Sequence, residues 1–312
     1  MSRAFRILVL VTLALTFVVV VVGAYVRLSD AGLGCPDWPL CYGQPLPGDI
    51  GDRDALAKAW KEMGHRYLAG TLGLLTVVIT LLSWRLRSGH WLATAILALV
   101  IFQATLGAWT VTMLLKPAIV TAHLLGGMAI LALLTWLALS QYNYFPDGRS
   151  SWLRLPGAAA LAALAVQIAL GGWVSSNYAA LACPDLPLCL GEALPPMDFG
   201  NAFHVVRELG QAADGRLLQR EALTAIHWSH RVFALVVLII VAWAAFRAYH
   251  VMKPLGAAIA ALLAAQFSLG VANVAFSLPL PLAAAHNAGA ALLLISLVVL
   301  NFFAFRGLRP FR

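Results

Sequence analysis

The chain contains GCPDWPLC at residues 34–41 and ACPDLPLC at residues 182–189, and six of the eight positions are identical. The repeat extends beyond this motif, because several polar residues recur in the same order 163 to 165 positions later. The recurring residues are His65 and Arg66 with His230 and Arg231, Gln103 and Gly107 with Gln266 and Gly270, and His123 with His286. Ordered matches of rare residues predict two related halves, which we assign to residues 1–145 and 146–312.

Each half carries four apolar segments long enough to cross a bilayer, which takes about 20 helical residues. The chain is 62% hydrophobic and 11% charged, whereas soluble domains carry roughly 25% charged residues. This composition excludes a soluble or disordered protein. The first segment is too long for a signal peptide and lacks a small-residue cleavage site, so we interpret it as a retained helix. The predicted spans are residues 7–27, 64–84, 91–113, 118–140, 156–176, 224–246, 254–275 and 283–305.

An even number of crossings gives both halves the same orientation in the membrane. We therefore predict an all-α membrane protein whose eight transmembrane helices form two four-helix bundles, related by a pseudo-two-fold axis along the membrane normal. The interior of such a bundle, between facing helices, is a usual place for a cofactor.

The basic residues are distributed as topology signals. Eleven of the 21 lysines and arginines, but only one acidic residue, Asp147, fall in the segments that share a side with both termini. The positive-inside rule makes this side cytoplasmic, and we expect a bacterial plasma membrane protein. The long segments 28–63 and 177–223, which hold all four cysteines, then lie outside. The net charge of +8 is explained in this way, so it does not indicate nucleic-acid binding.

Two pairs of histidines lie near the outer ends of the predicted helices. His65 opens the second helix, His123 lies about five residues into the fourth, and His230 and His286 repeat this placement. Paired imidazoles at one depth on two helices are typical of axial heme ligation. A single histidine would more often bond a neighbouring helix, and zinc would need further ligands. Two matching pairs in a repeat favour heme.

Two other kinds of polar residue accompany these histidines in both halves. Arg66 and Arg231 directly follow the first histidine of each pair, where they are candidate partners of heme propionates or interfacial side chains that reach toward water. Gln103 and Gln266 lie near mid-helix, where they line the pockets or bond neighbouring helices.

The halves differ at one informative position, three residues before His65 and His230. Glu62 occupies it in the first half and His227 in the second. A carboxylate on the same helix face as a presumed heme ligand is a candidate general base or charge stabiliser. The alternative is an acid that suits the first turn of a helix. His227 has several interpretations: a substitute ligand for His230, a partner of a ligand, or an interfacial group.

The cysteines form two C-x5-C pairs, which differ from the C-x-x-C pattern of thioredoxin-type motifs. An oxidising exterior favours the disulfides Cys35–Cys41 and Cys183–Cys189 as structural braces of the outer loops. The alternative is a pair of reducible bonds that exchange electrons with a partner. The spacing is compatible with both.

Taken in order, these features resemble the heme A synthase family. The resemblance rests on GLGCPDWPLC at residues 32–41, Glu62 with His65-Arg66, His123, the second cysteine pair, His230-Arg231 and His286. It implies oxidation of the C8 methyl of heme O to the formyl group of heme A through a hydroxymethyl intermediate. It further implies that His65 and His123 hold the substrate heme beside a catalytic Glu62, and that His230 and His286 hold a heme b cofactor. The implied partners are heme O synthase and terminal oxidase assembly. The resemblance is also compatible with an oligomer.

Three other functions compete with this interpretation. A di-heme b-type cytochrome passing electrons between quinone and an outer-side partner would explain the histidines but leave Glu62 without a role. A thiol–disulfide relay would not need four histidines at helix ends. A transporter would need broken helices with charges near the midplane, and the predicted spans carry none there.

Overall fold

The computed structural model describes residues 3–48, 50–146 and 148–309, and this part of the chain is mostly helical. Eight of its helices are long and apolar enough to cross a membrane. The prediction of an all-α protein with eight spans is therefore confirmed. The long helices are α1 (Arg3–Leu28), α2 (Arg53–Leu86), α3 (His90–Thr112), α4 (Pro117–Leu139), α5 (Arg154–Ser176), α7 (Arg220–Val251), α8 (Lys253–Ala275) and α9 (Leu280–Arg306).

Shorter elements complete the described chain. A four-residue helix, α6 (Phe199–Ala202), and a 3-10 turn, η2 (Ala179–Leu181), lie in the long segment before α7, and η1 (Gly148–Leu153) leads into α5. Strand β1 (Phe145–Pro146) pairs antiparallel with β2 (Leu308–Arg309), which ties the connection between the halves to the region after α9. Two charges counted for the topology, Asp147 and Arg312, lie outside the described residues.

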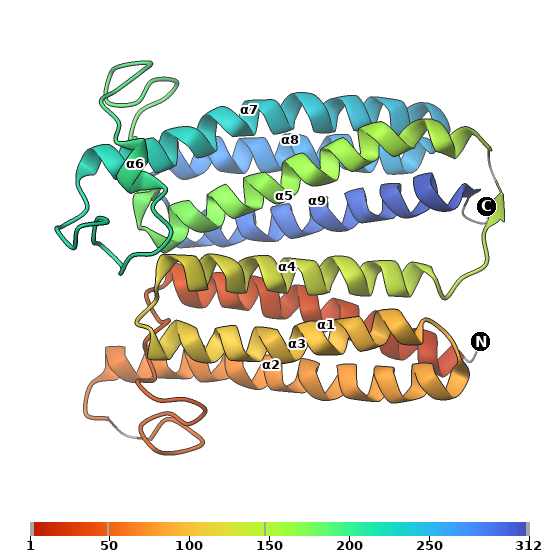
Figure 1. The fold of residues 1–312 in the computed structure, drawn as a ribbon, viewed down its shortest axis with the longest axis horizontal. Helices are drawn as coiled ribbons and strands as arrows, with labels where there is room; N and C mark the ends of the chain where they lie inside the picture. The colour runs from red at the N-terminus through yellow and green to blue at the C-terminus, as the bar shows by residue number, and fades with distance from the viewer. Residues whose placement is uncertain (1–2, 49, 147, 310–312) are drawn as a thin grey trace.

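The eight long helices form two four-helix bundles side by side (Figure 1). In the first, α1 packs on α2 and α4, and α3 packs on α2 and α4. In the second, α5, α7, α8 and α9 repeat these contacts in the same order. Between the bundles, α4 packs on α9, while α1 packs on α9 and α4 packs on α5. A two-fold rotation that exchanges the halves maps the α4–α9 contact onto itself. It also exchanges the α1–α9 contact with the α4–α5 contact, as the predicted pseudo-symmetry requires.

Burial follows from this arrangement. Helix α9 is the most buried of the eight spans, and α3 and α8 are the least buried. The outer helices expose large apolar side chains such as Ile101, Phe102 and Phe267. In water such a surface would be costly, whereas lipid chains solvate it at no cost. Each bundle therefore buries its polar groups between helices and presents apolar groups to the membrane.

Helix α2 begins earlier than predicted, at Arg53 rather than residue 64. Its first three turns mix charged and apolar residues, so a search for apolar segments does not detect them, but their alanines, lysines and Leu56 favour a helix. Asp52 caps the helix by accepting a bond from the Asp54 backbone N–H at 3.0 Å. The prediction that His65 opens the helix is therefore wrong, since His65 lies in its interior. Glu62 likewise lies beyond the first turn.

One end of the molecule carries both long loops, and α1 begins and α9 ends at the opposite end (Figure 1). We call the first of these the loop end. Here Arg27 of the first half donates to the Ser175 carbonyl of the second at 2.6 Å and lies over the Tyr178 ring at 4.0 Å. The hydroxyls of Thr121 and Ser176 are hydrogen-bonded at 3.1 Å. These polar contacts join the two bundles beside the histidines.

Candidate functional site

The four predicted ligand histidines lie on the helices that the repeat assigns to them. His65 is on α2 and His123 on α4, and their ring centroids are 6.5 Å apart with planes at 82°. His230 is on α7 and His286 on α9, the corresponding helices of the second bundle. All four are partly buried. The structure thus brings the first pair together inside one bundle.

This first pair has the geometry and chemistry to hold a metal centre with one imidazole on each side. A metal ion between the rings would be bonded to one nitrogen of each imidazole at about 2 Å. These two bonds and the distance from each nitrogen to the centre of its own ring together match the separation of 6.5 Å between the ring centroids. In all four histidines, Nδ1 is buried and has no hydrogen-bond partner among the described residues. Buried polar atoms without partners are rare. The donor set, two neutral imidazoles in an apolar bundle, suits heme iron.

Each of the four rings lies against a glycine of the preceding long helix. A Cβ added at these glycines would come within 2.8–3.3 Å of the ring Cε1 atom. Real Cβ contacts are essentially never under 3.0 Å and rarely under 3.4 Å, so a larger residue would push the ring away. The pairs are Gly23 with His65, Gly107 with His123, Gly171 with His230, and Gly270 with His286.

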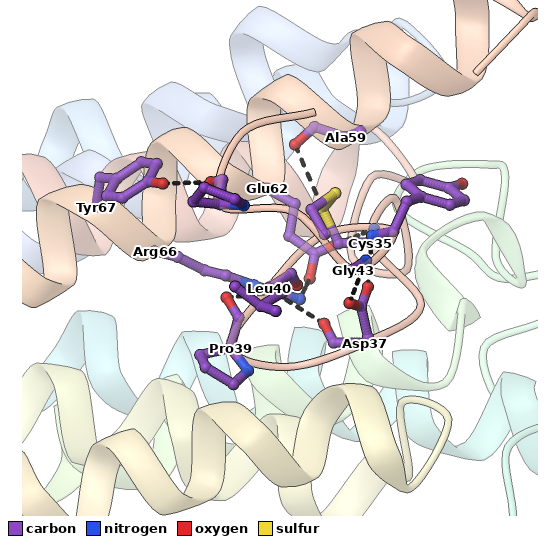
Figure 2. The surroundings of a disulfide bond; sticks show 12 residues. Cys35, Asp37, Pro39, Leu40, Gly43, Ala59, Glu62, Arg66 and Tyr67 are labelled. Carbon is purple, nitrogen blue, oxygen red and sulfur yellow. Dashed lines mark hydrogen bonds and ion pairs between the residues drawn. A yellow bond between two sulfur atoms is a disulfide. The ribbon is translucent and has the colours of Figure 1, made fainter. Parts of the chain in front are cut away.

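Glu62 connects α2 to the first disulfide loop (Figure 2). The residue is only 5% exposed. One carboxylate oxygen accepts a hydrogen bond from the Cys35 backbone N–H at 2.8 Å, and the other pairs with Arg66, one turn along the helix. Both oxygens are therefore held in place on the helix face that also carries His65. A fixed, buried carboxylate beside a predicted heme ligand is suited to accept a proton or to stabilise positive charge.

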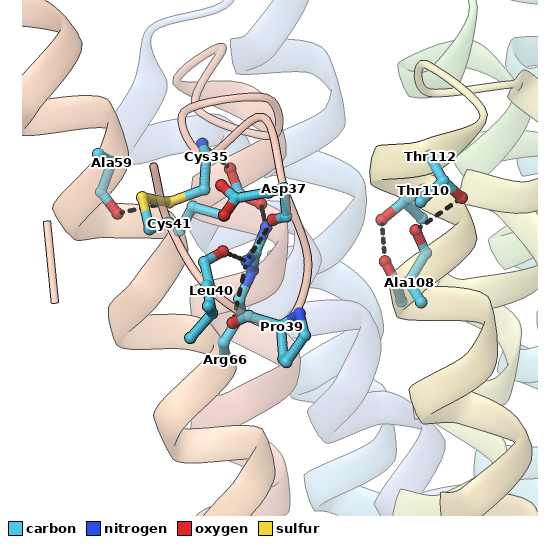
Figure 3. Close-up of polar contacts among 12 residues, drawn as sticks. Cys35, Asp37, Pro39, Leu40, Cys41, Ala59, Arg66, Ala108, Thr110 and Thr112 are labelled. Atoms are coloured by element: carbon cyan, nitrogen blue, oxygen red, sulfur yellow. Dashed lines mark hydrogen bonds and ion pairs between the residues drawn. A yellow bond between two sulfur atoms is a disulfide. The ribbon is translucent and has the colours of Figure 1, made fainter. Parts of the chain in front are cut away.

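Arg66 fixes the rest of that loop (Figure 3). Its guanidinium donates to the backbone carbonyls of Asp37 at 2.9 Å and Leu40 at 2.7 Å, in addition to its pairing with Glu62. A planar guanidinium can serve several acceptors at once, which a lysine could not do in the same geometry. The structure thus gives Arg66 a structural task, and contact with a heme propionate stays a prediction for both Arg66 and Arg231.

His227 occupies the position of Glu62 in the second half. The Cys183 backbone N–H approaches its Nδ1 at 3.3 Å, and Arg231 Nε approaches its Nε2 at 3.2 Å. A neutral imidazole has one acceptor nitrogen, so it satisfies only one of these two donors, whereas a carboxylate satisfies both. Arg231 also donates to the Cys183 carbonyl at 2.6 Å and the Asp185 carbonyl at 2.9 Å. His227 therefore braces the second loop in a way that resembles Glu62 but without its charge.

Both cysteine pairs form disulfides, Cys35–Cys41 and Cys183–Cys189, each with Cα atoms 4.7 Å apart. All four cysteines are almost completely buried. Cys41 exchanges two backbone hydrogen bonds with Gln44, which closes the loop directly after the disulfide. Buried disulfides fastened by Glu62, Arg66 and their counterparts fit the structural reading of the cysteines.

Asp37 and Asp185 stabilise the turn inside each loop. The Asp37 carboxylate accepts from the Tyr42 and Gly43 backbone N–H groups at 2.6 and 2.8 Å, and Asp185 makes the equivalent bonds. Both turn residues have positive φ, 54° at Tyr42 and 74° at Gly43. The N–H of Gly43 is the largest influence and holds the pKa of Asp37 below its usual 3.8; desolvation opposes it, and the Tyr42 N–H adds to the lowering.

This pKa shift predicts that acid loosens the loops. A carboxyl group with a depressed pKa stabilises the folded form above its unfolded pKa and loses that contribution as the pH falls through the folded value. We therefore expect amide protection at Tyr42 and Gly43, measured by hydrogen exchange, to decrease between about pH 6 and about pH 3. Asp37→Asn should lower the protection at the higher pH, whereas Asp54→Asn should not. Unchanged protection across this range would refute the role of Asp37.

One buried charge escaped the sequence analysis. Arg207, 5% exposed, lies in the loop before α7. It pairs with the Asn177 side chain and the Gln211 carbonyl and lies 5.6 Å from the centre of the Trp173 ring. Burial lowers the pKa of Arg207. Asn177 and Trp173 lie at the end of α5, and nothing in the local sequence around Arg207 indicates that it meets them.

Comparison with known proteins identifies the family. The family model described as "Cytochrome oxidase assembly protein" matches residues 6–298, nearly the whole chain. The chain belongs to this family. The match covers both bundles, including the four histidines, Glu62 and both disulfides.

Several curated proteins that are similar to this chain carry the name heme A synthase. The protein from Shewanella oneidensis is 40% identical over 311 aligned residues, which cover 94% of this chain and 94% of the relative. The protein from Caulobacter vibrioides is 30% identical, with 99% and 97% covered, and that from Maricaulis maris is 28% identical, with 95% of each covered. The resemblance noted from the sequence is thereby confirmed at the level of the family.

Proposed function

We propose that this membrane protein is a heme A synthase, an oxidoreductase that converts heme O to heme A. It oxidises the C8 methyl group to a formyl group through a hydroxymethyl intermediate. With water supplying the oxygen atom, the conversion of CH3 to CHO releases four electrons and four protons, so it needs a group that accepts protons and a route by which electrons leave. The relatives of that name support the overall reaction. The observation that carries the proposal is the fixed, buried carboxylate of Glu62 beside a facing pair of histidines.

In this proposal the first bundle, residues 1–145, holds the substrate heme between His65 and His123. Glu62 lies one turn before His65 on α2, at the loop end of the bundle. Because Arg66 and the Cys35 N–H hold both its oxygens, Glu62 accepts a proton or stabilises developing positive charge without reorganising.

The second bundle, residues 146–312, holds a heme b cofactor between His230 and His286. A bound heme b would accept electrons one at a time and pass them on. The residues fit this task because both Nδ1 atoms are buried without partners, as in the first bundle. His227, in place of Glu62, leaves this bundle without a carboxylate at the equivalent position. The difference between the halves is therefore a difference between a reacting site and an electron-transfer site.

The orientation belongs to the same proposal. Both ends of the chain face the cytoplasm of a bacterial cell, and the disulfide loops face outward, as the distribution of lysines and arginines indicates. The oxidising exterior maintains the two disulfides. Heme O arrives from heme O synthase within the membrane, and the product passes to terminal oxidase assembly.

The proposal is tested by the hemes that the protein carries. The chain is expressed in a host that supplies heme O and is purified, and its hemes are extracted with acid and separated by chromatography. We expect heme b together with heme O, its hydroxymethyl form or heme A. Heme b alone, despite available heme O, would contradict the proposal and favour the di-heme cytochrome.

A further inference from the structure

A short sequence, Gln-x-x-Leu-Gly, occurs on three of the four helices that pack against a ligand histidine. It is found at residues 103–107 of α3, 167–171 of α5 and 266–270 of α8. The last residue of each copy is the glycine that lies against the histidine ring. The glutamine is one helical turn earlier and therefore points toward the same neighbouring helix.

Each of these glutamines contacts the histidine that its glycine faces. Gln103 Nε2 donates to the backbone carbonyl of His123. Gln167 Nε2 donates to the carbonyl of His230 at 3.1 Å and lies 3.5 Å from its ring Nε2. Gln266 Nε2 lies 3.3 Å from the ring Nε2 of His286. The three contacts join the two helices at the level of the histidine, and those of Gln167 and Gln266 also reach its ring.

Glycines also make room for two of the glutamines. A Cβ at Gly126, three residues after His123, would collide with Gln103 Oε1, and a Cβ at Gly289 would collide with Gln266 Oε1 in the same way. The amide is thus confined between two helix backbones, so it has little freedom to leave the histidine.

The fourth histidine lacks this contact. At the repeat offset of 148, Gln167 corresponds to Val19 and Gly171 to Gly23 on α1. Gly23 lies against His65, so the glycine is kept. Val19 is buried in the apolar cluster with Leu72 and Ile130. Among the described residues, no side chain of another helix donates a hydrogen bond to His65.

We propose that the three glutamines are positioning residues that hold His123, His230 and His286, and that Val19 leaves His65 the more mobile ligand. The second bundle then holds both its ligands firmly and retains its heme. The first bundle holds one of two, so its heme exchanges. This inference rests on the proposed function, in which the first site must admit a substrate and release a product on every turnover.

The size of the effect follows from a single hydrogen bond. Such bonds contribute about 0.5–1.5 kcal/mol net, which corresponds to roughly a two- to tenfold change in a rate or equilibrium constant. A change of this size is measurable in the transfer of heme from the purified protein to excess apomyoglobin. Chromatography of the heme that remains distinguishes release of heme O from release of heme b.

We expect heme O to leave the unaltered protein faster than heme b. Gln167→Val should speed the release of heme b roughly two- to tenfold while leaving the release of heme O unchanged. Val19→Gln should slow the release of heme O by a similar factor. The matched controls are Gln141→Val, which removes a buried glutamine at the opposite end of the first bundle, and Val18→Gln, which adds one on the exposed face of α1. Neither control should alter either rate.

Failure of this inference is distinguishable from failure of the proposed function. If both hemes are bound but neither Gln167→Val nor Val19→Gln changes a release rate, the glutamines only join helices and the inference is overturned. If Gln167→Val does not fold, Val19→Gln decides alone, because it adds a hydrogen-bonding group beside His65 and removes no hydrogen bond of the protein. A protein that binds no heme would overturn the proposed function and this inference together.

Discussion

Glu62→Gln is expected to abolish formation of the formyl group while heme stays bound in the first bundle. Glutamine has the same length, and its carbonyl oxygen can still accept the bond from the Cys35 N–H. It cannot take up a proton or carry the charge that pairs with Arg66. General base catalysis contributes roughly 10²–10⁴-fold to a rate, so we expect heme A formation to fall by at least about a hundredfold. The measurement is heme A per total heme in purified protein.

A loss of activity could also arise from a loosened loop, because Glu62 supports the first disulfide loop. Limited proteolysis of that loop, compared between the variant and the unaltered protein, separates the two causes. The matched control is Glu221→Gln, which neutralises an exposed acid in the first turn of α7. It should leave heme A formation unchanged. Normal heme A from Glu62→Gln would refute the catalytic role of Glu62.

His286→Ala is expected to empty the second bundle of heme b and to stop heme A formation. In the proposed assignment the variant removes one of two axial ligands, and the remaining His230 cannot hold the heme from both sides. Heme O should still be present, because His65 and His123 lie in the other bundle. We therefore expect heme b content to fall to near zero, heme O to remain, and heme A to drop by at least about a hundredfold, because electrons have no exit.

The control for this variant is His250→Ala, an exposed histidine at the opposite end of the second bundle from the loops. It should retain both hemes and normal product. Full heme b content in His286→Ala would show that the ligand assignment is wrong. Loss of heme b with normal heme A would instead remove the second heme from the reaction.

The sequence was sufficient to predict the spans and the repeat, because both depend on local composition and on position along the chain. The apolar segments agree with the observed helices to within a few residues, except at the start of α2. There the chain leaves the apolar layer while remaining helical. A search for apolar segments detects where the apolar layer ends, but it does not detect that α2 continues as a helix beyond it.

The bonding around Glu62 could be predicted only in part. Its place beside His65 follows from helical spacing, which the sequence specifies. Its bond to the Cys35 N–H links positions 27 apart, and Arg66 completes the site through loop carbonyls. Backbone carbonyls have no residue-specific signal, so these partners were not evident. The matching position of His227 was evident, but its role as a brace required the loop geometry.

Gln167 was missed for a different reason. Gln103 and Gln266 share the offset of 163 that relates His123 to His286, which indicates a common role. Gln167 has no counterpart at its own offset, where the first half carries Val19. A search for matching pairs therefore passes over it. The sequence indicates Gln167 in another way, through three copies of Gln-x-x-Leu-Gly. The meaning of this motif depends on the structure, in which the glycine of each copy lies against a histidine ring.

The central claim, that this protein oxidises heme O in its first bundle, is tested most directly by a time course. Membrane vesicles containing the protein and heme O are incubated in air, and samples are extracted and separated by chromatography. The account predicts that heme O falls, the hydroxymethyl form rises and then falls, heme A accumulates, and heme b stays constant. Heme O that remains unchanged while heme b is fully present would contradict it.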